Sequence, residues 1–360
     1  MKETASDSRR RSALSTRHSA PAFVALFLAV ALVSSAPPAT ASTRLNLDAR
    51  DASSLTVPGA NFFPESIAAT PAGTLFVGSV VTGEILRFRP GSTTAETLVP
   101  AGVNAGTVGL FADIVRGVLG ACAVDLSFQR PTALRAFDLR TGTLRATYEV
   151  PDRGVCADIA LAHGDVYITD TTDPTAATRL PGRILRLTTP RPSQADGGTL
   201  TVWSADPLFT RPAPSAPTFP VAFQINGIAF DGLSTLYTTN LSTGELVGVR
   251  IRLDGSAAPA SVIDLDRDLV VPDGIRMLDP TQLLVTELVG RLTLVNVHTG
   301  ATTVVSESLD QPTSVVRVGG SLWVSEGQTL RLVLGQPPNL PFTVRRLSVP
   351  KLPPGPSWPE

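Results

Sequence analysis

The hydrophobic positions of this chain fall in short runs that are separated by turns. The clearest stretch spans residues 226–250, where apolar runs at 228–230 and 236–237 flank an Asp-Gly turn. After a second turn, a third apolar run follows at 246–249. Runs of this length are typical of β-strands and are too short for helices. The stretch therefore predicts one antiparallel unit of strand, turn, strand, turn and strand.

The same unit recurs along the chain, in about six copies that lie roughly 40 to 70 residues apart. The other copies cover residues 65–88, 157–187, 273–295 and 313–332, the last with its third strand at 328–332, and a weaker copy covers 108–139. Candidate fourth strands lie at 144–150, 200–204, 261–265 and 302–306. Repeated four-stranded units predict an all-β protein, a six-bladed β-propeller with four-stranded antiparallel blades. A β-sandwich does not require the same strand–turn–strand sequence in every unit, and the coils of a β-helix are shorter than these repeats.

Composition is that of an ordinary globular protein. The chain has 360 residues, of which 43% are hydrophobic and 17% charged, with a formal net charge of −1. Without a basic or acidic excess, nothing points to nucleic acid as a partner. We expect a small-molecule substrate or ligand as the partner, and a monomer.

The N-terminal residues have the pattern of a secretory signal peptide. Arginines precede an apolar run at 22–33, and small residues at 39–41 match a cleavage site. The run is short for a permanent membrane anchor, which is the alternative. We therefore expect a signal peptide over residues 1–41 and a single propeller domain over 42–360. This implies export to the periplasm or the extracellular space, without stable membrane insertion after cleavage.

Export would place the two cysteines, Cys122 and Cys156, in an oxidising compartment. They fall on neighbouring copies of the repeat, so a disulfide between them is one expectation. Two buried free thiols are the alternative.

Two further segments have a predicted role in the fold. Residues 43–57 are expected to form a strand that pairs into the last blade and closes the ring. Residues 204–224 are too rich in proline for regular structure, and a long loop in a compact domain is commonly functional. Since this loop leads directly into Asn226, we expect it to act as a lid.

One equivalent position lies two residues before the leading Ile, Leu or Val of each copy, and it is polar in four of the six. The equivalent residues are Glu65, Val108, Ala157, Asn226, Asp273 and Thr313. Closure of the ring should bring these positions together around the central axis, so that Glu65, Asn226 and Asp273 converge. Two carboxylates and an amide oxygen are ligands for a hard cation such as Ca²⁺, Mg²⁺ or Mn²⁺. The cation would also offset the repulsion between the two carboxylates.

The phrases Pro64-Glu65-Ser66, Asn226-Gly-Ile-Ala-Phe and Pro272-Asp273-Gly-Ile resemble those of the senescence marker protein (regucalcin) and gluconolactonase family of six-bladed propellers. The resemblance covers roughly residues 60–335. It implies that Glu65, Asn226 and Asp273 hold one divalent cation, with Ca²⁺ as the first choice.

The chain departs from the family in its third copy. The family often has Asn-Asp there, with the Asn in contact with metal or substrate, whereas this chain has Ala157-Asp158. The resemblance therefore implies that one polar contact is lost. Asp158 would then serve as a substrate contact, or point into the blade and bond neighbouring backbone.

A second set of polar residues ends the second strands: Asp170, Asn240, Glu287 and Glu326. The resemblance places them towards the face that holds the metal, where they could contact substrate. The alternative is that they cap strand ends and bond the backbone of turns.

These residues favour an exported, divalent-metal-dependent hydrolase of lactones or related esters. A metal-activated water would attack the carbonyl, with Asp273 or Glu65 as the catalytic group that orients it or accepts its proton. His163 and His298 lie in turns, and the chain has no Gly-x-Ser-x-Gly elbow, which disfavours a serine hydrolase. The alternative is a non-catalytic propeller that binds a ligand or partner and carries a structural cation.

Overall fold

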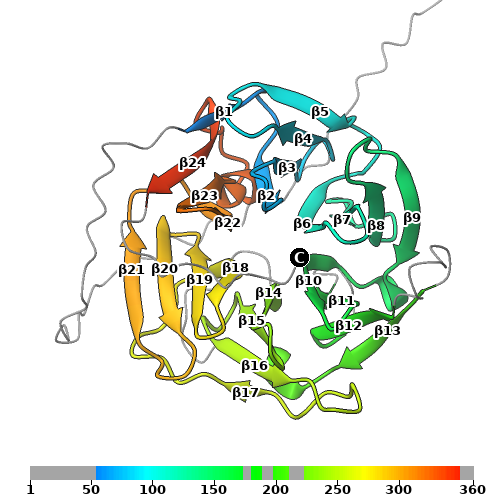
Figure 1. The fold of residues 1–360 in the computed structure, drawn as a ribbon, viewed down its shortest axis with the longest axis vertical. Helices are drawn as coiled ribbons and strands as arrows, with labels where there is room; N and C mark the ends of the chain where they lie inside the picture. Colours follow the sequence, from blue (N-terminus) through cyan, green and yellow to red (C-terminus); the bar gives the residue numbers. More distant parts are fainter. Residues whose placement is uncertain (1–53, 173–179, 189–197, 211–222, 349–360) are drawn as a thin grey trace, which may run out of the picture. The chain divides into compact units, whose positions relative to one another are not determined.

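The computed structural model describes residues 54–172, 180–188, 198–210 and 223–348. These residues form six antiparallel sheets of four strands each, arranged as the blades of a β-propeller (Figure 1). The first strand of each blade contacts the first strands of the two blades beside it, in cyclic order. The predicted six-bladed propeller is therefore confirmed.

Every blade runs from an innermost strand near the axis to an outermost strand at the rim (Figure 1). Blade 1 contains β2 (Pro64–Ala69), β3 (Leu75–Ser79), β4 (Ile85–Phe88) and β5 (Ala95–Val99), and blade 2 contains β6 (Thr107–Asp113), β7 (Val118–Ala123), β8 (Ala133–Asp138) and β9 (Leu144–Glu149). Blade 3 contains β10 (Cys156–Ala162), β11 (Asp165–Asp170), β12 (Arg183–Thr188) and β13 (Thr199–Ser204), and blade 4 contains β14 (Ile225–Phe230), β15 (Thr235–Asn240), β16 (Leu246–Arg250) and β17 (Ser261–Val262). Blade 5 contains β18 (Pro272–Asp279), β19 (Gln282–Glu287), β20 (Arg291–Asn296) and β21 (Thr302–Ser306), and blade 6 contains β22 (Pro312–Val318), β23 (Ser321–Glu326), β24 (Phe342–Ser348) and β1 (Leu55–Val57). In the described ranges, three short helices lie between strands: η2 (Pro151–Arg153), η3 (Pro207–Phe209) and α1 (Thr329–Val333).

The ring is closed by the N-terminal strand. β1 pairs antiparallel with β24, so that Leu55 lies opposite Val344 and Val57 opposite Phe342. All four of these side chains are buried in one apolar cluster that blades 1 and 6 share. The closing strand is thus observed over residues 55–57, while residues 43–53 lie outside the described part of the chain.

The third strand of blade 6 is not where the sequence pattern put it. Residues 328–332 were expected to be this strand, and that expectation is wrong, because 329–333 form α1 and the third strand is β24. Gln328 starts the helix from a left-handed conformation with φ of 53°. The side-chain carbonyl of Gln311 accepts hydrogen bonds from the first helical N–H groups, those of Leu330 and Arg331. The apolar spacing of this segment therefore belongs to a helical turn rather than to a strand.

A register shift occurs near the start of the first strand in all six blades. The shifts include the six positions that the sequence repeat aligns, namely Glu65, Val108, Ala157, Asn226, Asp273 and Thr313. A β-bulge adds a residue to one strand and re-aims its side chain. The bulge gives these residues a common orientation that a regular strand would not provide.

Adjacent blades are joined where the second strand of one blade meets the first strand of the next. The contact comes from the penultimate residue of the second strand, which is a hydroxyl residue in blades 3 to 6. The four hydroxyls donate to backbone carbonyls of the following blade: Thr169 to Asn226, Thr239 to Asp273 (2.9 Å), Thr286 to Thr313 (3.1 Å) and Ser325 to Glu65 (3.3 Å). We call these four contacts the hydroxyl belt.

The two remaining blade junctions use other chemistry at the same place. In blade 2 the equivalent residue is Cys122, which forms a disulfide with Cys156 on the first strand of blade 3. In blade 1 it is Gly78, where an added Cβ would lie 2.6 Å from the methyl group of Thr107 in blade 2. Thus the same structural position faces the next blade at all six junctions.

Some expectations fall on residues that are not described. The predicted signal peptide (1–41) lies outside the described residues, as does most of the predicted lid, at 211–222. Within the described ranges, no helix has the length and apolar character needed to cross a membrane.

The hydroxyl belt predicts a specific loss of stability. Thr239 also accepts a hydrogen bond from Gly227 N (3.0 Å), so Thr239→Val leaves two buried backbone groups without a partner. We expect the free energy of unfolding to fall by about 2 kcal/mol, measured by urea denaturation. The same substitution at the exposed Thr93 should cost less than about 0.5 kcal/mol. Equal losses in the two variants would contradict this role of the belt.

Candidate functional site

A small cavity lies on the axis, where the first strands of all six blades meet. Its volume is about 10 Å³, which is room for roughly one water-sized sphere. It is lined by Glu65, Ser66, Val108, Ala157, Asp158, Asn226, Asp273, Gly274, Thr313 and Ser314. The six positions that the repeat aligns therefore do converge, and Glu65, Asn226 and Asp273 are among them.

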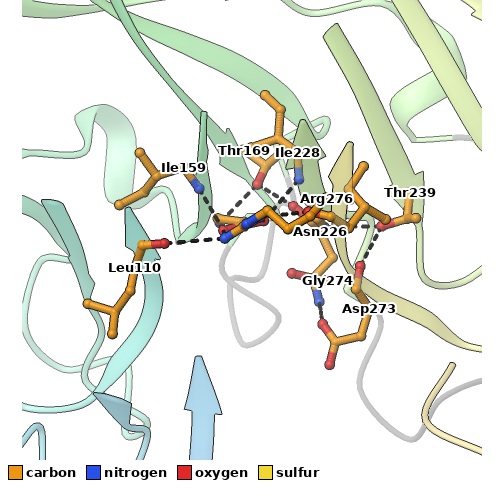
Figure 2. A network of polar contacts seen from close by, with 12 residues as sticks. Leu110, Ile159, Thr169, Asn226, Ile228, Thr239, Asp273, Gly274 and Arg276 are labelled. Atoms are coloured by element: carbon orange, nitrogen blue, oxygen red, sulfur yellow. Dashed lines mark hydrogen bonds and ion pairs between the residues drawn. The ribbon is translucent and has the colours of Figure 1, made fainter. Parts of the chain in front are cut away.

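Asn226 and Asp273 are in direct contact at this cavity. The side-chain amide of Asn226 donates from Nδ2 to Asp273 Oδ1 at 2.7 Å (Figure 2). Because the amide nitrogen is used in this way, the amide oxygen of Asn226 remains available as an acceptor or ligand. The Asp273 side chain is only 4% exposed, so its charge is poorly solvated.

Glu65 faces the same cavity with an unsatisfied oxygen. Its Oε2 is buried and has no hydrogen-bond partner among the described residues. A buried carboxylate oxygen without a partner is costly and rare in native proteins. Such an atom marks the place where a ligand, a cation or a proton belongs.

The two carboxyl groups are difficult to ionise in this setting. Burial raises the pKa of Glu65 well above its ordinary value, and the negative charges of Asp273 and Asp158 raise it further, against the opposing effect of Arg276. The pKa of Asp273 is likewise raised well above its ordinary value by burial and by the charge of Asp158. A cation in the cavity would reverse these shifts, since it favours the ionised form of both groups.

The chain enters some of the first strands through a residue in the left-handed conformation that precedes a proline. Phe63 precedes Pro64 with φ of 47°, and Val271 precedes Pro272 with φ of 49°. A β-branched or bulky residue rarely adopts this left-handed region, and such strain is characteristic of functional sites. The candidate ligands Glu65 and Asp273 follow directly after these prolines, but the same conformation recurs at Gln311 (φ of 52°) before Pro312 in blade 6, so it is a feature of three blade entries rather than of the ligand positions alone.

Asp158 is held by four donors and does not point freely into the cavity. Its carboxylate accepts from the backbone N–H groups of Ile159 (2.8 Å) and Ile228 (3.1 Å). The guanidinium of Arg276 pairs with both of its oxygens, at 2.8 and 3.3 Å. The contacts of Asp158 are therefore those expected of a side chain that bonds neighbouring backbone.

Three polar residues of the site were missed in the sequence. Arg276 lies at a position where the other five blades have apolar residues, namely Ala68, Phe111, Ala160, Ala229 and Val316. That contrast was a usable signal. Ser66 and Ser314 line the cavity one residue after the aligned polar position, and extending the alignment by one residue would have found them.

The residues that end the second strands do not line the cavity. Asp170, Asn240, Glu287 and Glu326 are all buried, and each accepts hydrogen bonds from the backbone of a nearby loop. Three of them also pair with an arginine of the same region, as Glu287 does with Arg267 at 2.6 Å. These contacts match the alternative expectation, in which the four residues bond the backbone of turns rather than a substrate.

The donor set of the cavity suits a hard cation. It offers carboxylate oxygens from Glu65 and Asp273 and the amide oxygen of Asn226, which are typical ligands of Ca²⁺ and Mg²⁺. Val108 and Ala157 make the opposite wall apolar. Among the described residues there is no group of three or more His, Cys, Asp and Glu side chains that could hold a metal, so Asn226 is needed to complete a protein ligand set.

Neither a protein-family model nor a curated protein sequence matches this chain. Solved structures do match it in fold, and they include gluconolactonases. The gluconolactonase of Xanthomonas campestris aligns with a TM-score of 0.60 and 19% identity over 86% of this chain and 94% of its own. A candidate gluconolactonase aligns with a TM-score of 0.61 and 12% identity, over 85% and 96% respectively. The PQQ-bound aldose sugar dehydrogenase of Streptomyces coelicolor aligns with 0.52 and 15%, over 82% and 98%. At these identities the likeness establishes the propeller fold.

The raised pKa values of Glu65 and Asp273 predict how stability depends on pH. Without a cation, the folded chain retains protons that the unfolded chain loses at about pH 4. The contribution of these protonated carboxyl groups to stability is therefore fully present below the unfolded pKa. It is lost as the pH rises through the raised pKa values of the folded chain. We expect the melting temperature in chelator to fall over this range, and to fall less in Glu65→Gln, because an amide does not titrate.

The matched control is Glu149→Gln, which changes an exposed glutamate and should keep the pH profile of the wild type. Identical pH profiles for Glu65→Gln and the wild type would contradict a raised pKa at Glu65.

Proposed function

We propose that this protein is a divalent-metal-dependent hydrolase of lactones or related esters, and that Glu65, Asn226 and Asp273 hold the cation. The observation that carries the proposal is the unpartnered Glu65 Oε2 in a cavity shared with Asn226 and Asp273. The cavity has the size of a single ion or water, and all its candidate ligands are hard oxygens.

The charges around the cavity favour a divalent ion. Glu65, Asp158 and Asp273 carry three carboxylates, and Arg276 supplies one guanidinium. When all four groups are ionised, two excess negative charges remain in a buried region. Uncompensated buried charge is strongly unfavourable, and one divalent cation would neutralise it. Ca²⁺ is the first choice, because it accepts carboxylate and carbonyl-type oxygens in flexible geometry, with Mg²⁺ and Mn²⁺ as alternatives.

The chemistry of ester opening can be assigned to the residues present. When bound, the cation supplies a Lewis acid that polarises a carbonyl and makes a nearby water more acidic. Asn226 holds Asp273 in place through the Nδ2–Oδ1 hydrogen bond. The carboxylates of Glu65 and Asp273 line the same cavity and are the groups that would orient the water or accept its proton.

The hydrolytic step then needs no covalent intermediate on the protein. Water loses a proton to a carboxylate, and its oxygen adds to the carbonyl carbon. The ring C–O bond of the lactone breaks, and the leaving alkoxide oxygen receives the proton, which gives a hydroxy acid. Lactones are small and uncharged, which suits a site whose own charges the cation would balance.

Two further considerations support the proposal. Gluconolactonases are among the solved structures that share this fold, although a propeller alone can host many activities. The N-terminal pattern of residues 1–41 suggests an exported enzyme, which fits a hydrolase of diffusible lactones.

A non-catalytic propeller with a structural cation is the second candidate. It is favoured by Ala157, which lines the cavity at the position where the resembling family has a polar contact. In this case the cation would bind as proposed, but no lactone or ester would be turned over.

Calorimetric titration of chelator-stripped protein with Ca²⁺, Mg²⁺ and Mn²⁺ tests the proposal, together with hydrolysis assays on γ- and δ-lactones and aryl esters. We expect one cation site in the wild type. Glu65→Gln and Asp273→Asn should each weaken binding at least about tenfold and lower turnover at least about a hundredfold, since each removes a charged ligand. The exposed Glu149→Gln should change neither.

The possible outcomes separate the two candidates. Cation binding without hydrolysis of any of these substrates would favour the non-catalytic propeller. If the wild type bound none of the three cations, the metal-dependent hydrolase would be rejected.

A further inference from the structure

An ion pair lies across the propeller axis next to the candidate cation site. Arg276 extends from β18 in blade 5, and its guanidinium pairs with Asp158 in blade 3. The same guanidinium donates to the backbone carbonyl of Leu110 in blade 2 at 3.2 Å (Figure 2). Arg276 thus connects three blades across the centre, and its side chain is only 17% exposed.

We propose that Arg276 is a positioning residue that holds Asp158 away from the cation and thereby sets the cation affinity of the cavity. The proposal rests on the function proposed above, because it concerns the same site. It assigns to the Asp158–Arg276 pair a regulatory effect on binding, and not a place among the ligands.

Asp158 is close enough to act on both candidate ligands. It lines the cavity, and its negative charge contributes to the raised pKa of Glu65 and of Asp273. Arg276 opposes the effect at Glu65. With Arg276 in place the pair is electrically balanced, and both carboxylate oxygens are occupied. Without Arg276, the cavity would gain a third uncompensated carboxylate, and affinity for Ca²⁺ rises with the number of charged ligands.

The fold itself does not require this pair. The equivalents of Asp158 in blades 2, 4 and 5 are Gly109, Gly227 and Gly274, where an added Cβ would meet backbone atoms of the next blade at 2.7, 2.5 and 2.4 Å. Blade 3 instead carries an aspartate at this position, which accepts from Ile228 N in blade 4. The other blades form the same junction without an ion pair, so the junction alone does not call for Arg276.

A charge-balance cycle tests the proposal. Calorimetric titration with Ca²⁺ compares the wild type with Arg276→Met, Asp158→Asn and the double variant. We expect Arg276→Met to tighten binding about tenfold and Asp158→Asn to weaken it about tenfold, because the charge near the cation changes by one unit in opposite directions. The double variant, in which both charges are absent, should return to within about threefold of the wild type.

The Arg186–Asp165 pair provides a matched control. Its arginine side chain is 27% exposed, and neither residue lines the cavity. Arg186→Met should therefore leave the Ca²⁺ affinity unchanged. Thermal melting in chelator identifies variants that do not fold. If Arg276→Met were among them, the comparison of Asp158→Asn with the double variant would still test the proposal, because removing Arg276 from Asp158→Asn should strengthen binding about tenfold.

The outcomes distinguish this inference from the proposed function. If the wild type does not bind a cation, the proposed function fails. If it binds Ca²⁺ but folded Arg276→Met binds equally or more weakly, the positioning role is rejected and the pair is structural. A double variant weaker than both single variants would reject the role in the same way.

Discussion

The structure depends on one repeated contact, in which the second strand of each blade is fixed to the first strand of the next. In four junctions a hydroxyl makes this contact, and its acceptors are the backbone carbonyls of Glu65, Asn226, Asp273 and Thr313. These are the residues whose side chains form most of the polar wall of the cavity. A hydrogen bond to the main chain of a cavity residue fixes the position of the backbone from which its side chain extends. The carbonyls that accept from the hydroxyl belt belong to residues that line the cavity. A change in how the blades pack would therefore also change the geometry of the cavity.

The same arrangement explains how the protein tolerates several charges at its centre. A buried ion pair is stable when its remaining hydrogen-bonding capacity is also satisfied. Asp158 meets this condition through two backbone N–H groups and Arg276. Glu65 does not, since its Oε2 has no partner among the described residues. The centre of the propeller therefore contains one satisfied charge pair beside one unsatisfied carboxylate, and this asymmetry points to the candidate ligand site more sharply than the number of acidic residues does.

Much of this could be predicted from the sequence, because a repeat constrains many positions at once. The strand phrase identified the blades, and its alignment identified Glu65, Asn226 and Asp273 as neighbours although up to 208 positions separate them in the chain. Two features were not predicted, for different reasons. The apolar spacing at 328–332 suits a strand and a helical turn equally. The segment forms the helical turn, which starts at Gln328 in a left-handed conformation that the spacing does not reveal. Arg276 was missed because its partner Asp158 is 118 residues away, and only the assembled ring brings the two together.

The composition of the cavity wall also limits what the site can select. Blades 2 and 3 contribute Val108 and Ala157 at the aligned position, so one side of the cavity offers no side-chain hydrogen bond to a ligand. An apolar contact discriminates weakly between similar substrates, whereas a buried polar group can reject an analogue that leaves it unpaired. Arg276 and Asp158 satisfy each other and are not free to select either. Under the proposed function, a small cavity with these properties would activate a carbonyl group but recognise little beyond it. Any narrow substrate preference must therefore arise from residues above the cavity, outside the ring of first strands.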